Sequence, residues 1–239
     1  MSRFVVAGIF MSFLCLTVSL AYAADAWQQG IDDGVSLRQQ GRLQRSVNVL
    51  REAKKAAQNP SRSAVTAAEL GATLLLEHRF NDAEVELLEA FRGTSGEIRA
   101  RVANDLGNLY FARKQHDLAR DYFNEASRGA TSDPSLAIAI KLNLIRMSPQ
   151  AETLNQLQDL MPALSALPPT RQQARLLLNL GEQASQLGIP GLPLAHSALD
   201  VARRTAEKNG ENRLRLEATD ALSQLYEGRF QIPSATDLG

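Results

Sequence analysis

Two stretches of this chain carry the same spacing of small, apolar and aromatic residues. Gly71 and Gly107 stand 36 residues apart. The same residue types surround each glycine, in the order Leu70, Gly71, Leu74, Ala83, Leu87, Ala90 and then Leu106, Gly107, Tyr110, Ala119, Phe123, Ala126. A repeat of this length predicts one supersecondary unit used several times, and it constrains the fold more than any other feature of the sequence.

The residue types in the repeat predict two antiparallel helices per unit. Glycine and alanine fit where two helices approach closely, because a larger side chain would hold the backbones apart. Leucine and aromatic residues fill the wider gaps between the helices. A single hairpin cannot cover its own apolar face, so at least three hairpins must stack before a continuous core exists.

Further copies extend the array on both sides. A degraded copy comes first in the chain, with Gly34 at the glycine position and Ser46 where the other copies have alanine. Later in the chain, Leu180 and Gly181 restart the pattern. The alanines that follow lie two residues too far on, which predicts an insertion within 189–193.

We predict an all-α fold of about five to six helical hairpins between residues 24 and 239. Three hairpins are clear and the others are degenerate. The clear ones span about 27–60, 64–97 and 100–133, and the degenerate ones span 135–168, 171–209 and 213–239. Turns within the clear hairpins are expected at 41–43, 78–80 and 114–116. Pro60 and Pro134 are expected just past helix ends, since proline cannot continue a helix.

The spacing resembles the tetratricopeptide repeat (TPR), in which Leu-Gly, an aromatic residue and two alanines recur with a period of about 34 residues. The resemblance implies a right-handed solenoid in which the first helix of each hairpin lines a concave groove that binds other chains. Groove candidates, counted from Gly107 and from the neighbouring copies, are Glu69, Arg101, Asn104, Asp105, Asn108, Lys141, Asn179 and Glu182.

The two asparagines among these candidates suit the backbone of an extended peptide. Each carboxamide offers hydrogen-bond donors and an acceptor together, and Asn104 and Asn108 fall on one helix face. The alternative interpretation of this whole set is an ordinary polar helix surface.

Residues 1–23 are expected to lie outside the array as a cleaved secretory signal peptide. The run 4–20 is mostly apolar behind Arg3, and an Ala-x-Ala cleavage site ends at Ala23. A membrane-spanning anchor is the alternative, but about 17 residues is the short limit for crossing a bilayer. Cleavage would remove Cys15, and the leucine before this cysteine disfavours a lipoprotein. We therefore expect a secreted, periplasmic protein.

The charge balance argues against nucleic acid as a partner. The sequence has 26 Lys plus Arg and 26 Asp plus Glu, and loss of Arg3 with the signal peptide leaves a net charge of −1. Nucleic-acid binding needs a concentrated basic surface. No second apolar run is long enough to cross a membrane, and without cysteine the mature chain is not expected to contain disulfides.

Residues that would support catalysis or a cofactor are scarce. His78 and His196 each have an aspartate four residues on, but neither has a second histidine nearby to complete a metal site. His116 has Arg120 at that place. The mature chain has no cysteine nucleophile, no G-x-S-x-G and no phosphate-binding glycine loop. We expect a protein without enzymatic activity, cofactor or metal.

The order of motifs along the chain is similar to the exported TPR half of bacterial CHAT-domain proteins. The motifs are the signal peptide, Trp-Gln-Gln-Gly at 27–30, the Ala-, Leu- and Pro-rich run at 163–169, and the segment 225–230. In that family the repeats precede a caspase-like domain with a His and Cys pair, and the mature chain has no cysteine to match it. The resemblance implies a recognition half without the enzyme.

The expected function is a periplasmic or cell-envelope scaffold that binds a peptide or partner protein in the concave groove. Two alternatives stay open: the recognition or regulatory half of a split or truncated CHAT-type protease, and a structural subunit of an envelope complex. The second helix expected around Ala235 has too few residues to cover its partner's apolar face. Three alternatives for its cover stay open: a partner, a lost domain, or a second copy of the chain, which would mean self-association through the C-terminal hairpin.

Overall fold

The computed structural model describes residues 26–129 and 132–230, with side chains as far as Glu227. Every regular element within these residues is helical, and the helices form hairpins, which confirms the predicted all-α fold class. The chain divides after Gly129 into two compact units, and each is described by itself. The expected cleavage after Ala23, and the helix expected around Ala235, concern residues outside the described part.

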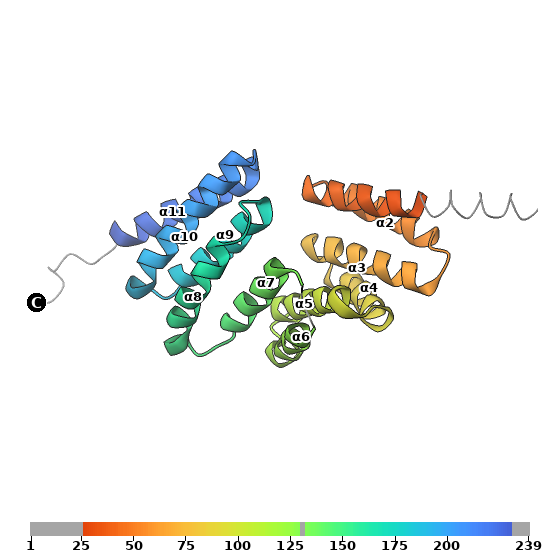
Figure 1. Cartoon of the computed structure of the whole chain (residues 1–239), viewed down its shortest axis with the longest axis horizontal. Coiled ribbons are helices and arrows are strands. Elements are labelled where there is room, and N and C mark those ends of the chain that lie inside the picture. Colours follow the sequence, from red (N-terminus) through yellow and green to blue (C-terminus); the bar gives the residue numbers. More distant parts are fainter. Residues whose placement is uncertain (1–25, 130–131, 231–239) are drawn as a thin grey trace, which may run out of the picture. The chain divides into compact units, whose positions relative to one another are not determined.

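The first unit is built from three helical hairpins (Figure 1). Its helices are 26–39, α2 (Leu43–Lys55), α3 (Pro60–Leu76), α4 (Phe80–Gly93), α5 (Gly96–Ala112) and α6 (His116–Arg128). From α2 onward each helix packs on the next, and α3 also contacts α5. The first helices of the second and third hairpins therefore lie side by side.

Glycine marks the closest helix approach in each hairpin of the first unit. A Cβ at Gly71 would lie 2.6 Å from Cγ of Leu87, and a Cβ at Gly107 would collide with the ring of Phe123. Leu87 and Phe123 are fully buried, as are the alanines of both repeats. The spacing that defines the repeat is therefore the spacing of the contacts between helices.

The hairpin turns of the first unit share one backbone conformation. Gly41, His78 and Lys114 stand at equivalent positions, with φ of 75°, 58° and 62°. In each turn the next residue donates its backbone N–H to the carbonyl five residues back, at 2.9 to 3.0 Å. This hydrogen bond is typical of a Schellman helix end. The turns lie where the sequence predicts them, and the first uses glycine, which adopts positive φ without steric cost.

The second unit contains two hairpins followed by a long helix. Its α-helices are α7 (Pro134–Ile145), α8 (Gln150–Ser165), α9 (Arg171–Ser185), α10 (Leu192–Lys208) and α11 (Asn212–Phe230). A short 3-10 helix, η1 (Ile189–Gly191), separates α9 from α10 and follows Gly188, whose φ is 68°. The insertion predicted within 189–193 takes this form. Helix α10 packs on both α9 and α11, and α9 also contacts α11.

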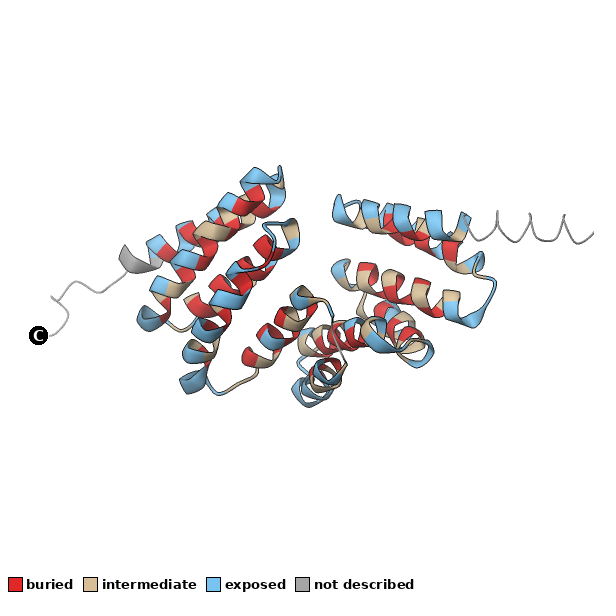
Figure 2. Cartoon of the chain, viewed as in Figure 1, coloured by how far each residue is buried: buried red, intermediate tan, exposed pale blue. Residues whose placement is uncertain are grey.

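Leucine and alanine form the core of the second unit. Figure 2 shows the buried positions along the sides of the helices that face their neighbours in the same unit. Gly181 repeats the arrangement of the first unit, since a Cβ there would lie 2.6 Å from Cγ of the fully buried Leu199. Pro60 and Pro134 each occupy the first residue of a helix, after the capping side chains of Asn59 and Asp133.

Candidate partner-binding surface

The residues predicted to bind a partner stand on the first helices of the hairpins. In the first unit these helices are 26–39, α3 and α5, and in the second unit they are α7, α9 and α11. Arg101, Asn104, Asp105 and Asn108 define the register, at −6, −3, −2 and +1 from the glycine position. We call the side chains at these offsets on any first helix the first-helix positions.

A cluster of charged side chains joins the three hairpins of the first unit. Arg38, on helix 26–39, donates to Oε2 of Glu69 at 2.6 Å and to the backbone oxygen of Glu69 at 3.0 Å. Nη1 of Arg101, on α5, lies 3.8 Å from the other carboxylate oxygen of Glu69. The side chains of Arg38 and Glu69 are largely buried. Glu69 therefore neutralises charge contributed by both neighbouring hairpins.

Asp105 lies next to this cluster and is held in an unfavourable environment for a charged carboxylate. Desolvation by burial raises the pKa of Asp105 to about 7, and the negative charge of Glu69 acts in the same direction. The positive charges of Arg38 and Arg101 and a hydrogen bond with Asn104 oppose this rise. Asp105 therefore holds its proton to a much higher pH than an exposed aspartate does.

The two predicted asparagines of α5 differ in access. Asn104 is only 7% exposed and its side chain is engaged with Asp105, so its carboxamide is not presented to a partner. Asn108 is half-buried, and the side chain of Arg101 is 46% exposed. The structure thus brings Glu69, Arg101, Asn104 and Asp105 together, but into a network that largely satisfies itself.

The predicted residues of α7 and α9 are spread over the second unit. Lys141 is exposed and lines a shallow hollow of about 340 Å³ between α7 and α8. Asn179, on α9, accepts a hydrogen bond from Nε2 of Gln183 at 2.7 Å, and the same nitrogen also donates to the backbone oxygen of Leu142. Asn179 therefore supports the packing of α9 on α7.

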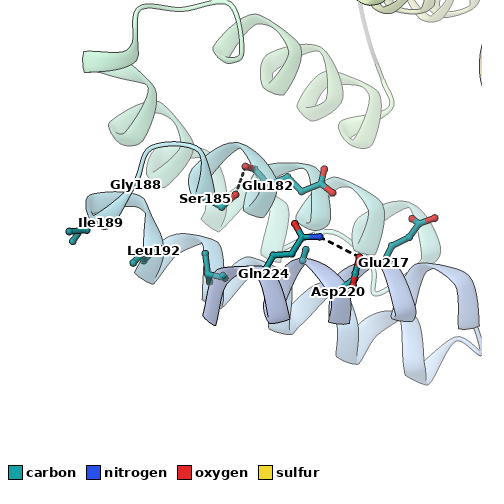
Figure 3. Close-up of a pocket in the computed structure, with 10 residues that line it drawn as sticks. Glu182, Ser185, Gly188, Ile189, Leu192, Glu217, Asp220 and Gln224 are labelled. Atoms are coloured by element: carbon teal, nitrogen blue, oxygen red, sulfur yellow. Dashed lines mark hydrogen bonds between the residues drawn. The ribbon is translucent and has the colours of Figure 1, made fainter. Parts of the chain in front are cut away.

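Glu182 lines a pocket of about 730 Å³ formed by α9, η1, the start of α10, and α11 (Figure 3). We call it the α9–α11 pocket. Its volume lies in the range of ligand-binding pockets, about 300 to 1,000 Å³. The lining residues are Glu182, Ser185, Gly188, Ile189, Leu192, Glu217, Asp220, Ala221, Gln224 and Leu225.

Four residues of this pocket are first-helix positions that the sequence analysis did not single out. Ser223 takes the glycine position of α11, and the register then gives Glu217, Asp220, Ala221 and Gln224 at −6, −3, −2 and +1. All four line the pocket. The same offsets, applied to Ser223 in this last helix, would have predicted these four residues from the sequence.

The three carboxylates of the pocket differ in the hydrogen bonds and positive charges that offset their negative charge. Glu217 accepts a hydrogen bond from Nε of Arg213 at 2.9 Å, and Arg175 lies 3.9 Å from its other oxygen. Asp220 accepts a hydrogen bond from Nε2 of Gln224 at 3.4 Å. Burial raises the pKa of Glu182, and the charge of Glu217 raises it further, against the effect of Arg175.

Metal-binding and membrane-spanning features are both absent from the described residues. Across 26–129 and 132–230, no three His, Cys, Asp or Glu side chains gather in a way that would hold a metal ion. None of the helices in these ranges has both the length and the apolar character needed to cross a bilayer.

Solved structures of TPR proteins resemble this chain, whereas neither the protein-family models nor the curated proteins compared with the sequence gave a match. PilF from Pseudomonas aeruginosa superposes with a TM-score of 0.54 and 18% identity, over 86% of this chain and 94% of that chain. YrrB, described as a TPR protein with an unusual peptide-binding site, gives 0.44 and 17%, over 85% of this chain and 97% of its own.

The likeness to PilF assigns the fold: this is an all-helical protein of the TPR-like solenoid class. The likeness to YrrB is too weak to add to this assignment. At 18% identity the likeness to PilF concerns the fold alone.

Proposed function

We propose that this protein is a non-enzymatic interaction scaffold that binds a peptide or an extended segment of a partner protein on its first-helix positions. The observation that carries the proposal is the α9–α11 pocket. Most of its lining residues come from two consecutive first helices, α9 and α11, and four of those from α11 follow the register that defines the candidates in the first unit.

The lining of this pocket suits a polypeptide ligand. Apolar side chains supply a surface whose burial stabilises a complex, and the same pocket holds groups that hydrogen-bond a peptide backbone. Ser185 and Gln224 provide such groups in the lining. A helical solenoid also presents its side chains from rigid elements, which lowers the conformational cost of binding.

The first unit offers less open surface at its first-helix positions. Its charged cluster is occupied with internal ion pairs, which stabilise the stacking of its hairpins. Arg101 and Asn108 remain the first-helix positions of α5 that a partner can reach, since one is exposed and the other half-buried. Asn108→Ala is expected to leave peptide binding at the α9–α11 pocket unchanged, and Asn104→Ala does not test this surface, because Asn104 is buried.

We further propose that the scaffold works in the periplasm or cell envelope. The proposal is supported by the sequence of residues 1–23, with its apolar run and Ala-x-Ala site. The intact mass of the natively expressed protein tests it. A mass that begins at Ala24, in the periplasmic fraction, is expected, and a chain that retains residues 1–23 would contradict cleavage.

A narrower role is the recognition half of a split CHAT-type protease system. The proposal is supported by the order of motifs that resembles exported CHAT-domain proteins, including the tryptophan motif at 27–30 and the segment 225–230. It predicts that proteolysis appears only when a second chain supplies the cysteine and histidine. Purification of partners that all lack such a pair would favour a plain scaffold or a structural subunit.

Peptide selection tests the main proposal. The full chain is immobilised, a random peptide library is selected against it, and the affinity of recovered peptides is measured by calorimetry. The Gln224→Trp variant places a bulky ring in the pocket, and Gln158→Trp, on the exposed side of α8, is the matched control.

The expected result is a loss of at least about tenfold in affinity with Gln224→Trp and less than about twofold with Gln158→Trp. Failure to recover any peptide that binds the full chain would contradict peptide recognition. Equal effects of the two tryptophans would contradict the first-helix surface as its location.

A further inference from the structure

The α9–α11 pocket has two chemically different ends. Figure 3 shows Glu182, Glu217 and Asp220 gathered at one end, and Ile189 and Leu192 at the other. The two ends belong to one continuous pocket, so a single ligand can contact both. The nature of each end then defines the chemistry of that ligand.

The acidic end lacks a matching positive charge in its lining. Its lining residues include three carboxylates and no lysine, arginine or histidine. Arg175 and Arg213 both pair with Glu217, which leaves Asp220 with a single amide donor. Within the described residues, the Glu182 carboxylate has no hydrogen bond and no ion pair within 4.0 Å. A cation entering here gains two carboxylates without displacing an existing ion pair.

The apolar end exposes aliphatic surface that no part of the described chain covers. Ile189 is 78% exposed, held outward by the η1 turn after Gly188. Leu192 and Leu225 are shared with an adjoining hollow of about 380 Å³, which Pro193, His196 and Tyr226 complete. Covering this surface with an apolar side chain stabilises a complex by about 25 cal/mol for each Å² removed from water.

From this polarity we infer that the pocket selects a partner segment in which a lysine or arginine stands next to a bulky apolar side chain. The inference rests on the proposed function and adds the chemistry of the ligand. The cationic group lies between Glu182 and Asp220, and the apolar side chain lies against Ile189, Leu192 and Leu225. The methylene stem of lysine or arginine bridges the two ends, because it is itself apolar.

The ionisation of Glu182 agrees with this assignment. Its pKa is raised by burial and by Glu217. Arg175 opposes this rise only in part, so a bound cation adds further compensation and stabilises the ionised carboxylate. The Glu182 carboxylate can therefore form an ion pair with a cation of the ligand.

Three synthetic peptides of equal length test the inference by fluorescence anisotropy with the full chain. One carries a central leucine–lysine–leucine within a Gly/Ser sequence, the second replaces lysine with glutamate, and the third replaces both leucines with serine. The protein variants are Glu182→Gln/Asp220→Asn and Ile189→Ser. Glu152→Gln/Glu207→Gln, at exposed positions outside the pocket, is the control with the same change in net charge.

The lysine peptide is expected to bind, and both substituted peptides to bind at least about tenfold more weakly. Glu182→Gln/Asp220→Asn should weaken the lysine peptide about tenfold and Ile189→Ser by about threefold to tenfold, while the control stays within about twofold. Affinity should also fall as salt rises, since one end of the pocket acts through charge. Circular dichroism of each variant confirms that its helices are intact.

Equal affinity for the lysine and glutamate peptides, or no effect of the double substitution, would overturn the inference while leaving peptide binding in place. Library-selected peptides that bind without any basic residue would also overturn the inference and leave peptide binding in place. A full chain that binds neither these nor any library-selected peptide would instead overturn the proposed function. A dimer that dissociates in Glu182→Gln/Asp220→Asn would make a second copy of the chain the occupant and overturn the inference.

Discussion

Asp105 is buried, and burial disfavours the ionised form that a carboxyl group normally takes at neutral pH. The pKa of this side chain in the folded state is about 7, against an ordinary value of 3.8. Desolvation is the main cause, and Arg38 and Arg101 compensate it only in part. Near neutral pH the folded chain therefore binds a proton that the unfolded chain has already released.

Stability should consequently fall as pH rises through this interval. Because the folded-state pKa is the higher one, the contribution of Asp105 is favourable below about pH 4 and is lost progressively up to about pH 7. The loss amounts to about 2 to 4 kcal/mol at 1.36 kcal/mol per pKa unit. The Asp105→Asn variant, which cannot ionise, should show a smaller decline of melting temperature between pH 4.5 and 8. Parallel declines in the two proteins would contradict this account.

The sequence predicted which helix each candidate residue lies on, but not how deeply each one is buried. The register placed Glu69, Arg101 and Asp105 on neighbouring first helices, and the structure brings them within reach of one another. The register did not reveal that Asn104 is buried, because an offset gives a direction on a helix and not the depth to which the neighbouring hairpin covers it. Ionisation likewise depends on desolvation by several elements, which no local spacing encodes.

At the scale of the element, the close helix crossings determine the hairpin. Gly107→Ala places a methyl group against the rigid, fully buried ring of Phe123. We expect a net loss of about 1 to 3 kcal/mol in the free energy of unfolding, despite the better helix propensity of alanine. Chemical denaturation followed by circular dichroism measures it.

Ser223→Ala is the matched substitution, since Ser223 holds the same register position in α11 but is exposed. It should change stability by less than about 0.5 kcal/mol. Similar losses in both variants would show that the glycine position is not a close crossing.

The hairpin turns offer a second test at this scale. Lys114 adopts φ of 62° where the first hairpin has Gly41. A left-handed conformation costs a residue with a side chain about 1 to 2 kcal/mol, and part of this is offset by the greater flexibility of unfolded glycine. Lys114→Gly should therefore stabilise the protein by about 0.5 to 1 kcal/mol, and Gly41→Ala should destabilise it. Stabilisation by both substitutions would contradict the shared turn.

Elements were the part of the fold that the sequence predicted best. Glycine and alanine at fixed offsets indicate helices that cross closely at those points. The hairpins, the turns and the insertion at 189–193 can therefore be predicted from the spacing. The pocket was not predicted. It depends on how α11 lies against α9 and on the outward turn of η1, and both are consequences of packing between elements.

At the scale of the whole molecule, the first-helix positions have different roles in the two units. In the first unit the first-helix positions of α3 and α5 pair with one another across hairpins. In the second unit those of α9 and α11 border an open pocket. We therefore expect Gln224→Trp to weaken peptide binding at least about tenfold without lowering the melting temperature. Arg38→Ala should lower the melting temperature without affecting peptide binding in α9 and α11. Loss of binding in Arg38→Ala would contradict this division of roles.

The most direct test of the central claim is a cross-linking map of the bound peptide. A selected peptide that carries a photoreactive group is irradiated with the full chain, and the linked positions are identified by mass spectrometry. Cross-links confined to residues 179–192 of α9, η1 and the start of α10, and to 217–226 of α11, are the result that this account predicts. Cross-links on the exposed side of α8, or scattered over both units, would contradict it.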